Sequence, residues 1–210
     1  MSIHIQKIGP LEIEAESFRI ISEEVGKTDL DEQTFKVVQR VIHATGDFSF
    51  LESMRFSPGA IDAGIRAIRE GKNILTDVNM AAAGISKTLL GKWGGRVFCK
   101  VADQEVAERA KAEHKTRSEI AIALGLQQNI GIVAIGNAPT ALVQSIKILK
   151  EDKNSPAPLV VGVPVGFVNA AESKELLTEE NSCYITNLGR KGGSPVAAAI
   201  VNALLRLSDN

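Results

Sequence analysis

The chain alternates short apolar runs with longer segments of helical periodicity from residue 57 onward. The apolar runs lie at 73–78, 96–101, 130–136, 158–165 and 183–188, and the run 130–136 shows no polar alternation. The helical segments lie at 57–71, 81–90, 104–124, 139–150, 170–180 and 195–207. Fully apolar strands that alternate with helices are typical of a parallel sheet covered on both faces. The pattern therefore predicts an α/β fold with a mainly parallel central sheet flanked by helices.

Local signals refine the ends of these elements. Ser57 is a plausible N-cap with Pro58 at the first helical position, and Gly71 is a plausible stop. Thr116 and Glu119 have the spacing of a capping box. The polar stretch 150–158 is typical of a surface loop, so we expect residues 1–210 to form a single domain with an N-terminal helical extension.

Residues 31–44 predict an amphipathic helix that contains one of the three histidines. At 100° per residue one broad face carries apolar side chains only: Phe35, Val37, Val38, Val41 and Ile42. The opposite face carries Lys36, Arg40 and His43. We therefore expect His43 outside the core, at the helix end. The pattern favours a solvated polar face, with a face turned toward an anionic ligand as the alternative.

Composition narrows the class of protein. The chain has 210 residues, 44% of them hydrophobic, and 24 basic against 25 acidic side chains give a net charge of −1. This balance argues against a nucleic-acid partner. Cys99 and Cys183 are isolated, so we expect no disulfide and a reducing, cytoplasmic location. No apolar run approaches the ~20 residues of a membrane span, no signal peptide is visible, and the histidine spacing predicts no protein-ligated metal.

The carboxyl ends of the predicted strands carry the candidate binding residues, because ligands of such sheets bind there. In 189–195 a glycine-rich turn leads into a helix beside Arg190 and Lys191, and free helix amides next to cations favour an anion. An ordinary strand-to-helix turn is the alternative. The turn 136–140 lacks a dinucleotide fingerprint, and Arg117 and Ser118 stand at another helix start. Together these features indicate a bulky polyanionic organic ligand.

Six motifs give the chain a family resemblance. They are ESFRII (16–21), VIHATGDF (41–48), TRSEIA (116–121), AIGNAPTAL (134–142), PVGFVNAAESK (164–174) and GRKGGSPVAAAI (189–200). In this order they resemble the precorrin-8X methylmutases, a family that includes the cobalt-precorrin-8 methylmutases of corrin biosynthesis. The resemblance extends over residues 8–207. One position departs from it, because we expect glycine where Asn169 stands.

The resemblance implies an isomerase that moves a methyl group from carbon 11 to carbon 12 of precorrin-8X or cobalt-precorrin-8. It implies His43 as the catalytic acid/base and no cofactor, since any cobalt belongs to the substrate. It also implies a homodimer with the site near the subunit interface. The implied substrate contacts are Ser17, Arg40, Thr45, Asn79, Thr116, Arg117, Ser118, Asn137, Arg190, Lys191, Gly192, Gly193 and Ser194.

Two other functions are compatible with parts of this pattern. A corrinoid-binding or product-carrier protein would use the same binding residues without turnover, and only His43 separates it from an isomerase. An α/β oxidoreductase or transferase that uses a nucleotide rests on analogy of fold alone.

Overall fold

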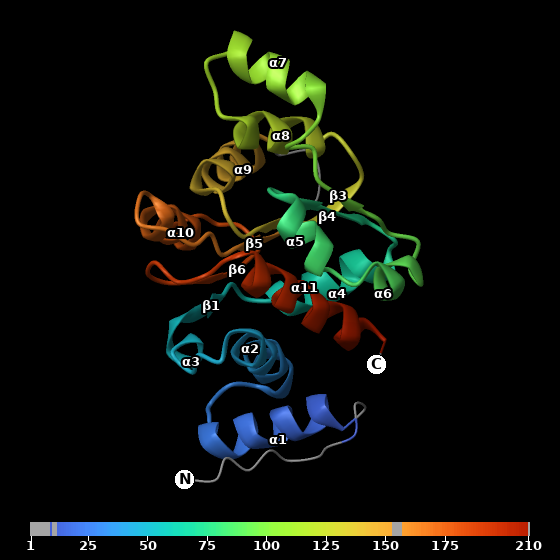
Figure 1. The fold of residues 1–210 in the computed structure, drawn as a ribbon, viewed down its shortest axis with the longest axis vertical. Coiled ribbons are helices and arrows are strands. Elements are labelled where there is room, and N and C mark those ends of the chain that lie inside the picture. The colour runs from blue at the N-terminus through green and yellow to red at the C-terminus, as the bar shows by residue number, and fades with distance from the viewer. Residues whose placement is uncertain (1–8, 10–11, 153–156, 210) are drawn as a thin grey trace.

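A six-stranded sheet forms the centre of the molecule in the computed structural model, which describes residues 9, 12–152 and 157–209 (Figure 1). The strand order is β1-β6-β5-β4-β2-β3. The strands are β1 (Met54–Phe56), β2 (Asn73–Thr76), β3 (Val97–Phe98), β4 (Ile130–Ile135), β5 (Leu159–Gly162) and β6 (Tyr184–Asn187). β1 pairs with β6 antiparallel and all other pairs are parallel. The predicted fold class is confirmed.

Helices cover both faces of this sheet (Figure 1). One face carries α8 (Arg117–Gly125), α9 (Pro139–Glu151) and α10 (Ala170–Glu179), with α7 (Gln104–Ala112) packed outside α8. The other face carries α4 (Ala60–Arg69), α5 (Asn79–Gly84), α6 (Lys87–Gly91) and α11 (Ser194–Ser208). α2 (Glu32–Thr45) packs against α11, α3 (Phe50–Ser53) follows it, and α1 (Ile13–Val25) lies outermost. The outer helix α1 is the predicted N-terminal extension.

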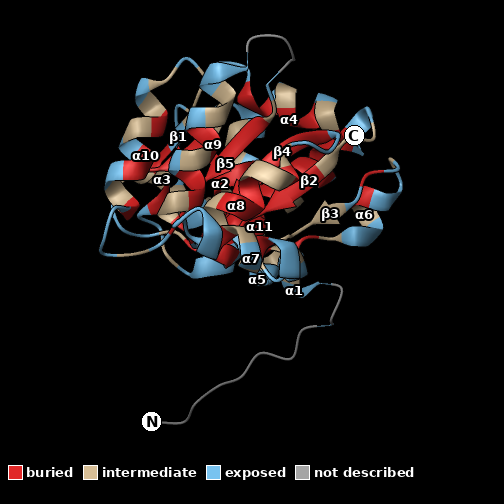
Figure 2. Ribbon diagram, turned by 90° about the horizontal axis from the view of Figure 1, so that it is seen from above, coloured by how far each residue is buried: buried red, intermediate tan, exposed pale blue. Residues whose placement is uncertain are grey.

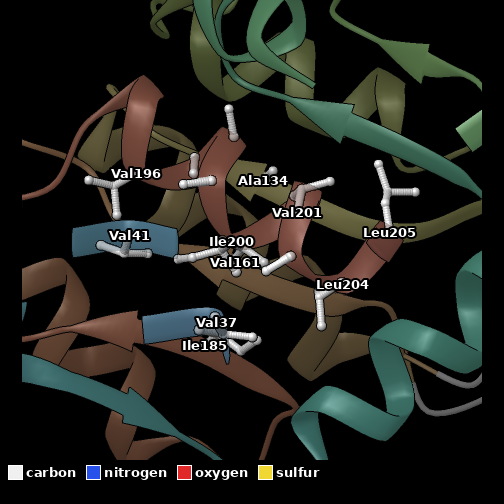
Figure 3. Close-up of a cluster of buried hydrophobic side chains, with 14 of the residues drawn as sticks. Val37, Val41, Ala134, Val161, Ile185, Val196, Ile200, Val201, Leu204 and Leu205 are labelled. Carbon is white, nitrogen blue, oxygen red and sulfur yellow. The ribbon is translucent and has the colours of Figure 1, made fainter. Parts of the chain in front are cut away.

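The largest part of the core lies where α11 is enclosed between the sheet and α2 (Figures 1 and 3). Figure 2 shows the buried residues gathered at the centre of the molecule. Ile200 and Leu204 of α11 are completely buried, as are Val37 and Val41 on the inner face of α2. Each such aliphatic side chain contributes about 1.5–3 kcal/mol through removal from water. The predicted apolar face of α2 is therefore confirmed, although Phe35 at its edge is only half-buried.

The prediction for Ser57 as a helix N-cap is wrong, because this residue directly follows strand β1 and bonds to β6. α4 begins at Ala60 with Gly59 in the left-handed conformation (φ 73°) at its N-cap. The Ser57 N–H donates to the Tyr184 carbonyl (3.0 Å), and the Tyr184 N–H donates to the Ser57 hydroxyl (2.8 Å). Both bonds continue the pairing of β1 with β6. The antiparallel edge strand β1, which the hydrophobic pattern did not predict, thus takes the side chain that looked like a cap.

Two predicted helices are each divided in the structure. The segment 104–124 breaks between α7 and α8, where His114 adopts φ 52° and Thr116 starts a new helix with the predicted capping box. The segment 81–90 divides into α5 and α6, with Ser86 as the N-cap of α6. In both places a capping side chain satisfies the free amides of a second helix start, so one continuous helix is replaced by two.

Smaller differences concern strand length and helix starts. The predicted strand 96–101 pairs over Val97–Phe98 alone. Ser194 is the first residue of α11, so Gly193 (φ 122°) is the N-cap in its place. Asn169, where glycine was expected, has φ 60° at the N-cap of α10. Left-handed backbone favours glycine and tolerates asparagine, which gives the expectation a physical reason.

We expect Gly136→Ala to lower the free energy of unfolding by about 1–3 kcal/mol, because the new methyl group overpacks a backbone contact. A Cβ at Gly136 would lie 2.7 Å from the Cα and N of Ser194. Urea denaturation checks this, with Gly91→Ala as control, since a Cβ at Gly91 meets nothing within 4 Å. Equal stability of the two variants would contradict the proposed close packing of β4 on α11.

Candidate functional site

The strand order marks the carboxyl ends of β2 and β4 as the candidate binding edge of the sheet. β3 flanks β2 on one side and β4 flanks it on the other, so the direction of strand addition reverses between β2 and β4. In open α/β sheets ligands bind at such a reversal, outside the carboxyl ends of the strands. Asn79, predicted to contact the substrate, is exposed here just after β2, and Asn137 is exposed just after β4.

Asp77 occupies the backbone amide groups of the turn that follows β4. Its side chain is fully buried and accepts hydrogen bonds from the N–H groups of Gly136 (3.0 Å), Asn137 (2.8 Å) and Ala138 (2.7 Å). Burial raises the pKa of the Asp77 carboxyl, and the three donors act against that rise. The turn 136–138 is therefore organised by the protein's own carboxylate, and Asn137 has only its side chain left for a ligand.

The N-termini of α8 and α9 meet beside this turn. The Thr116 hydroxyl donates to the Thr140 hydroxyl (3.2 Å) and also accepts from the Glu119 N–H (3.2 Å). Thr116 is therefore engaged in structure. Arg117 is exposed and has no ion pair among the residues that the structure describes, while Ser118 is half-buried beside it. Arg117 is thus a cation available to a ligand.

Backbone hydrogen bonds hold loop 189–193 against the end of β5. The Gly193 N–H donates to the Val163 carbonyl (2.8 Å), and the Gly166 N–H donates to the Arg190 carbonyl (3.2 Å). Gly192 lies so close to the Val163 carbonyl that no Cβ fits there. Within the described ranges neither the Gly192 N–H nor the Ser194 N–H donates a hydrogen bond. Ser194 is buried with its N next to Gly136, so the half-buried Gly192 is the better placed of the two for an anion.

Lys191 connects this loop to the helix that carries His43. Its Nζ donates to Asp47 Oδ2 (2.6 Å) and Ser49 Oγ (2.9 Å), just after α2 ends. The Lys191 ammonium and the Ser49 donors hold the pKa of the Asp47 carboxyl at about 2. The predicted sites around residues 43 and 189–193 therefore lie next to one another, at the same end of α2.

His43 is exposed in the last turn of α2, which confirms its predicted position outside the core. Its imidazole meets the Phe18 ring of α1 edge to face, with ring centres 5.2 Å apart. Thr45 follows on the exposed end of the helix, where its hydroxyl donates back to the Val41 carbonyl (2.8 Å). The ring of His43 therefore has one restrained side against α1 and one side open.

Arg40 faces α1 and not the loop 189–193. Its Nη1 donates to Glu14 Oε1 (2.8 Å), and its guanidinium lies 4.9 Å from the centre of the Phe18 ring. Arg206 donates to the same carboxylate (3.2 Å). Burial raises the pKa of the Glu14 carboxyl. The opposing effect of Arg40, Arg206 and His43 is larger, so the pKa is lowered overall.

The remaining groups of this helix and of α1 are also engaged within the fold. The Ser17 hydroxyl donates to the Ile13 carbonyl (2.8 Å) on α1, one residue before Phe18. Lys36 pairs with Glu32 one turn away (2.6 Å). Arg40 thus lies one helical turn before His43, Ser17 precedes the residue that contacts the imidazole, and Lys36 interacts with its own helix.

An apolar rim next to the candidate site was not predicted. Met80 after β2 and Val165, Phe167 and Val168 after β5 are exposed, with Phe167 84% and Val168 77% accessible. The Arg190 guanidinium lies 5.5 Å from the centre of the Phe167 ring. The hydrophobic pattern did not predict that Val165, at the end of an apolar run, and the apolar residues just after the runs would be exposed. A large flat ring with peripheral carboxylates matches a surface on which aromatic and cationic groups alternate.

Neither a metal cluster nor a membrane helix is found in the described part of the chain. Its His, Cys, Asp and Glu side chains form no group of three able to hold a metal ion. No helix there is long and apolar enough to cross a bilayer. Cys99 and Cys183 are both free and half-buried.

Three independent comparisons with known proteins indicate the same protein family. The family model for precorrin-8X methylmutase matches residues 12–207. A cobalt-precorrin-8 methylmutase of Priestia megaterium is 45% identical over 204 residues, which are 97% of this chain and 90% of the relative. A precorrin-8X methylmutase of Pseudomonas aeruginosa is 40% identical over 192 residues, 90% of this chain and 91% of the relative. A solved precorrin-8x methyl mutase of Thermus thermophilus matches with a TM-score of 0.86 and 41% identity, over 94% of this chain and 96% of that one.

We expect Asp77→Asn to lower the free energy of unfolding by about 2–4 kcal/mol. The amide offers one acceptor oxygen where the carboxylate offers two, and its NH₂ group faces backbone donors in a buried site. Urea denaturation measures the loss, with Asp62→Asn on the exposed face of α4 as control. A variant as stable as the control would show that Asp77 does not hold the turn 136–138.

The contact between Asp47 and Lys191 should persist across the working pH range and break only in strong acid. The folded-state pKa of Asp47 lies below its ordinary value of 3.8, so its stabilising effect is complete above that value. The effect is lost as the pH falls through about 2. NMR titration of the Asp47 carboxyl carbon should give this low midpoint in the wild type and a higher one in Lys191→Met. Identical midpoints would contradict the contact.

Proposed function

Because the chain belongs to the precorrin-8X methylmutase family, we propose that it is an isomerase of corrin biosynthesis that rearranges precorrin-8X or cobalt-precorrin-8. In this reaction the bond from a methyl group to carbon 11 of the macrocycle breaks and a bond to carbon 12 forms. The product is hydrogenobyrinate, or cobyrinate when cobalt is present. The observation that supports this function best is the exposed imidazole of His43 beside the tethered loop 189–193.

His43 is proposed as the general acid and base. Its imidazolium protonates, or donates a hydrogen bond to, a ring nitrogen beside the migrating methyl group, which polarises the conjugated system. The proton returns to His43 when migration is complete, so the reaction balances without an added reactant. Help of this kind gives roughly 10²–10⁴-fold acceleration. The edge contact with Phe18 supports the role, because it restrains the imidazole on one side.

The substrate's acetate and propionate carboxylates are proposed to bind the cations at the carboxyl edge of the sheet. Arg117 and Arg190 are exposed there, and Lys191 is held toward the end of α2. Arg40 reaches a substrate carboxylate only where that group displaces Glu14. Weaker polar contacts are proposed for a larger set: Ser17, Thr45, Asn79, Thr116, Ser118, Asn137, Gly192, Gly193 and Ser194.

The assembly is proposed to be a homodimer with the site near the subunit interface. The exposed apolar side chains Met80, Phe167 and Val168 support this, because single-subunit proteins rarely leave such a rim uncovered. Arg117 would then serve a neighbour's site. We further propose that the enzyme uses no bound cofactor and works in the cytoplasm, a location supported by its two free cysteines.

We expect His43→Ala to lower kcat by at least ~10²-fold while the affinity for the corrin product stays within about threefold, since the acid is lost and the binding groups remain. Formation of the corrin chromophore measures turnover and absorbance titration measures binding. His114→Asn is the control, because His114 is exposed on left-handed backbone that asparagine tolerates.

The same assay separates the isomerase from a carrier. Normal turnover by His43→Ala would contradict the role of His43, and tight binding without turnover by the wild type would favour a carrier. Binding of a nucleotide and of no corrinoid would favour an oxidoreductase or transferase. Incubation with metal-free and cobalt-containing substrate in parallel shows which one the enzyme converts.

A further inference from the structure

Lys174 of α10 is the largest fully buried side chain among the residues that the structure describes. Lysine is rarely buried in this way without a carboxylate partner, and no ion pair involves Lys174 in the described part of the chain. Its Nζ donates instead to the Lys191 carbonyl (2.6 Å). Burial lowers the pKa of this ammonium to about 8, so at neutral pH most molecules still carry the charge.

The Lys191 carbonyl accepts a second hydrogen bond from below the loop. Asn187, at the end of β6, donates its Nδ2 to this carbonyl (2.8 Å) and to that of Leu188 (3.2 Å). The buried Oδ1 of Asn187 has no hydrogen-bond partner in the described residues. Lys174 and Asn187 therefore hold the inner side of loop 189–193, opposite to the side on which the Lys191 ammonium meets Asp47.

A purely structural role explains this lysine poorly. The loop already has its backbone bonds to Val163 and Gly166 and its side-chain tether to Asp47. A buried cation without a counter-charge destabilises the free protein, and a neutral side chain of the same length would avoid that cost. The exposed cation Arg190 increases the cost further, because it belongs to the same loop, whereas Lys191 is paired with Asp47.

The missing negative charge has a source in the substrate. The Gly192 N–H belongs to the same peptide as the Lys191 carbonyl and points away from it, so a carboxylate at this amide would lie on the side of the loop opposite to Lys174. Its charge would offset the buried ammonium as well as the surface cation Arg190. The buried charge has a lower free energy in the complex than in the free protein, and this difference strengthens substrate binding.

We propose that Lys174 is a positioning residue for substrate binding, which fixes the Lys191 carbonyl and with it the free Gly192 amide of the same peptide, and which places a buried positive charge behind that amide. The ligand is a substrate carboxylate, so the inference rests on the proposed function. Lys174 touches the loop and not the substrate, and His43 carries the chemistry independently of it.

The test is Lys174→Met, which keeps the length of the side chain and removes both charge and donor. We expect the KM for the tetrapyrrole substrate to rise at least tenfold, with kcat within about threefold of the wild type. The melting temperature should stay unchanged or rise, because the uncompensated charge is gone. Lys147→Met on α9, where the lysine is exposed, should change neither quantity.

Two results would overturn the proposal. An unchanged KM would show that the buried charge does not contribute to binding, and a raised KM with a lowered melting temperature would show a part of the scaffold only. The failure of the proposed function looks different, because the wild type itself would then not convert the substrate. In that event the affinity of both proteins for hydrogenobyrinate, measured by absorbance titration, still decides the role of Lys174.

Discussion

The enclosure of α11 between the sheet and α2 is the constraint on which the site depends. α11 begins directly after loop 189–193, and its buried residues Ile200 and Leu204 fix its position between the two layers. The inner face of α2 packs on it through Val37 and Val41, which are fully buried. This one packing arrangement sets the distance between loop 189–193 and the helix end that carries His43. Lys191 and Asp47 then connect the two across the gap.

The protein satisfies some of its own anion sites and leaves others open. Asp77 takes the three amides after β4, and Glu14 takes the guanidinium of Arg40. The amides of Gly192 and Ser194 receive no such partner in the described part of the chain. Internal carboxylates therefore make the surrounding turns rigid, and the open donors remain for the ligand. Rigid placement of a few open donors is how a binding site keeps its geometry before the substrate arrives.

The sequence predicted the parts of the fold that repeat a simple period. Five apolar runs gave the parallel strands, and 100° spacing correctly placed Val37 and Val41 inside and His43 outside. The three-residue strand β1 carries no such period, and its pairing with β6 depends on residues more than 120 positions away in the chain. The capping pattern that assigned Ser57 to a helix start uses neighbouring residues only, so it could not include this distant partner.

The candidate site, like the fold, was predicted from the sequence only in part. Glycine-rich turns and cations at the strand ends were visible in the sequence, because their composition alone distinguishes them. The role of Asp77 was not, since a buried carboxylate and its three donors come from two separate strands. Lys174 and the exposed Phe167 each contradict the usual burial of their residue type. Such reversals depend on what covers each residue in space, which no local pattern contains.

The exposure of the site also bears on how its chemistry can proceed. An imidazolium acts best on a developing charge in a place from which water is excluded, yet His43 is open to solvent on the side away from Phe18. The exposed Met80, Val165 and Phe167 surround the same edge of the sheet and require cover of their own. A macrocycle that lies across these apolar side chains would shield them and His43 together. A second copy of the chain over the outer face would complete the exclusion of water, so that substrate binding and subunit association would serve the same physical need.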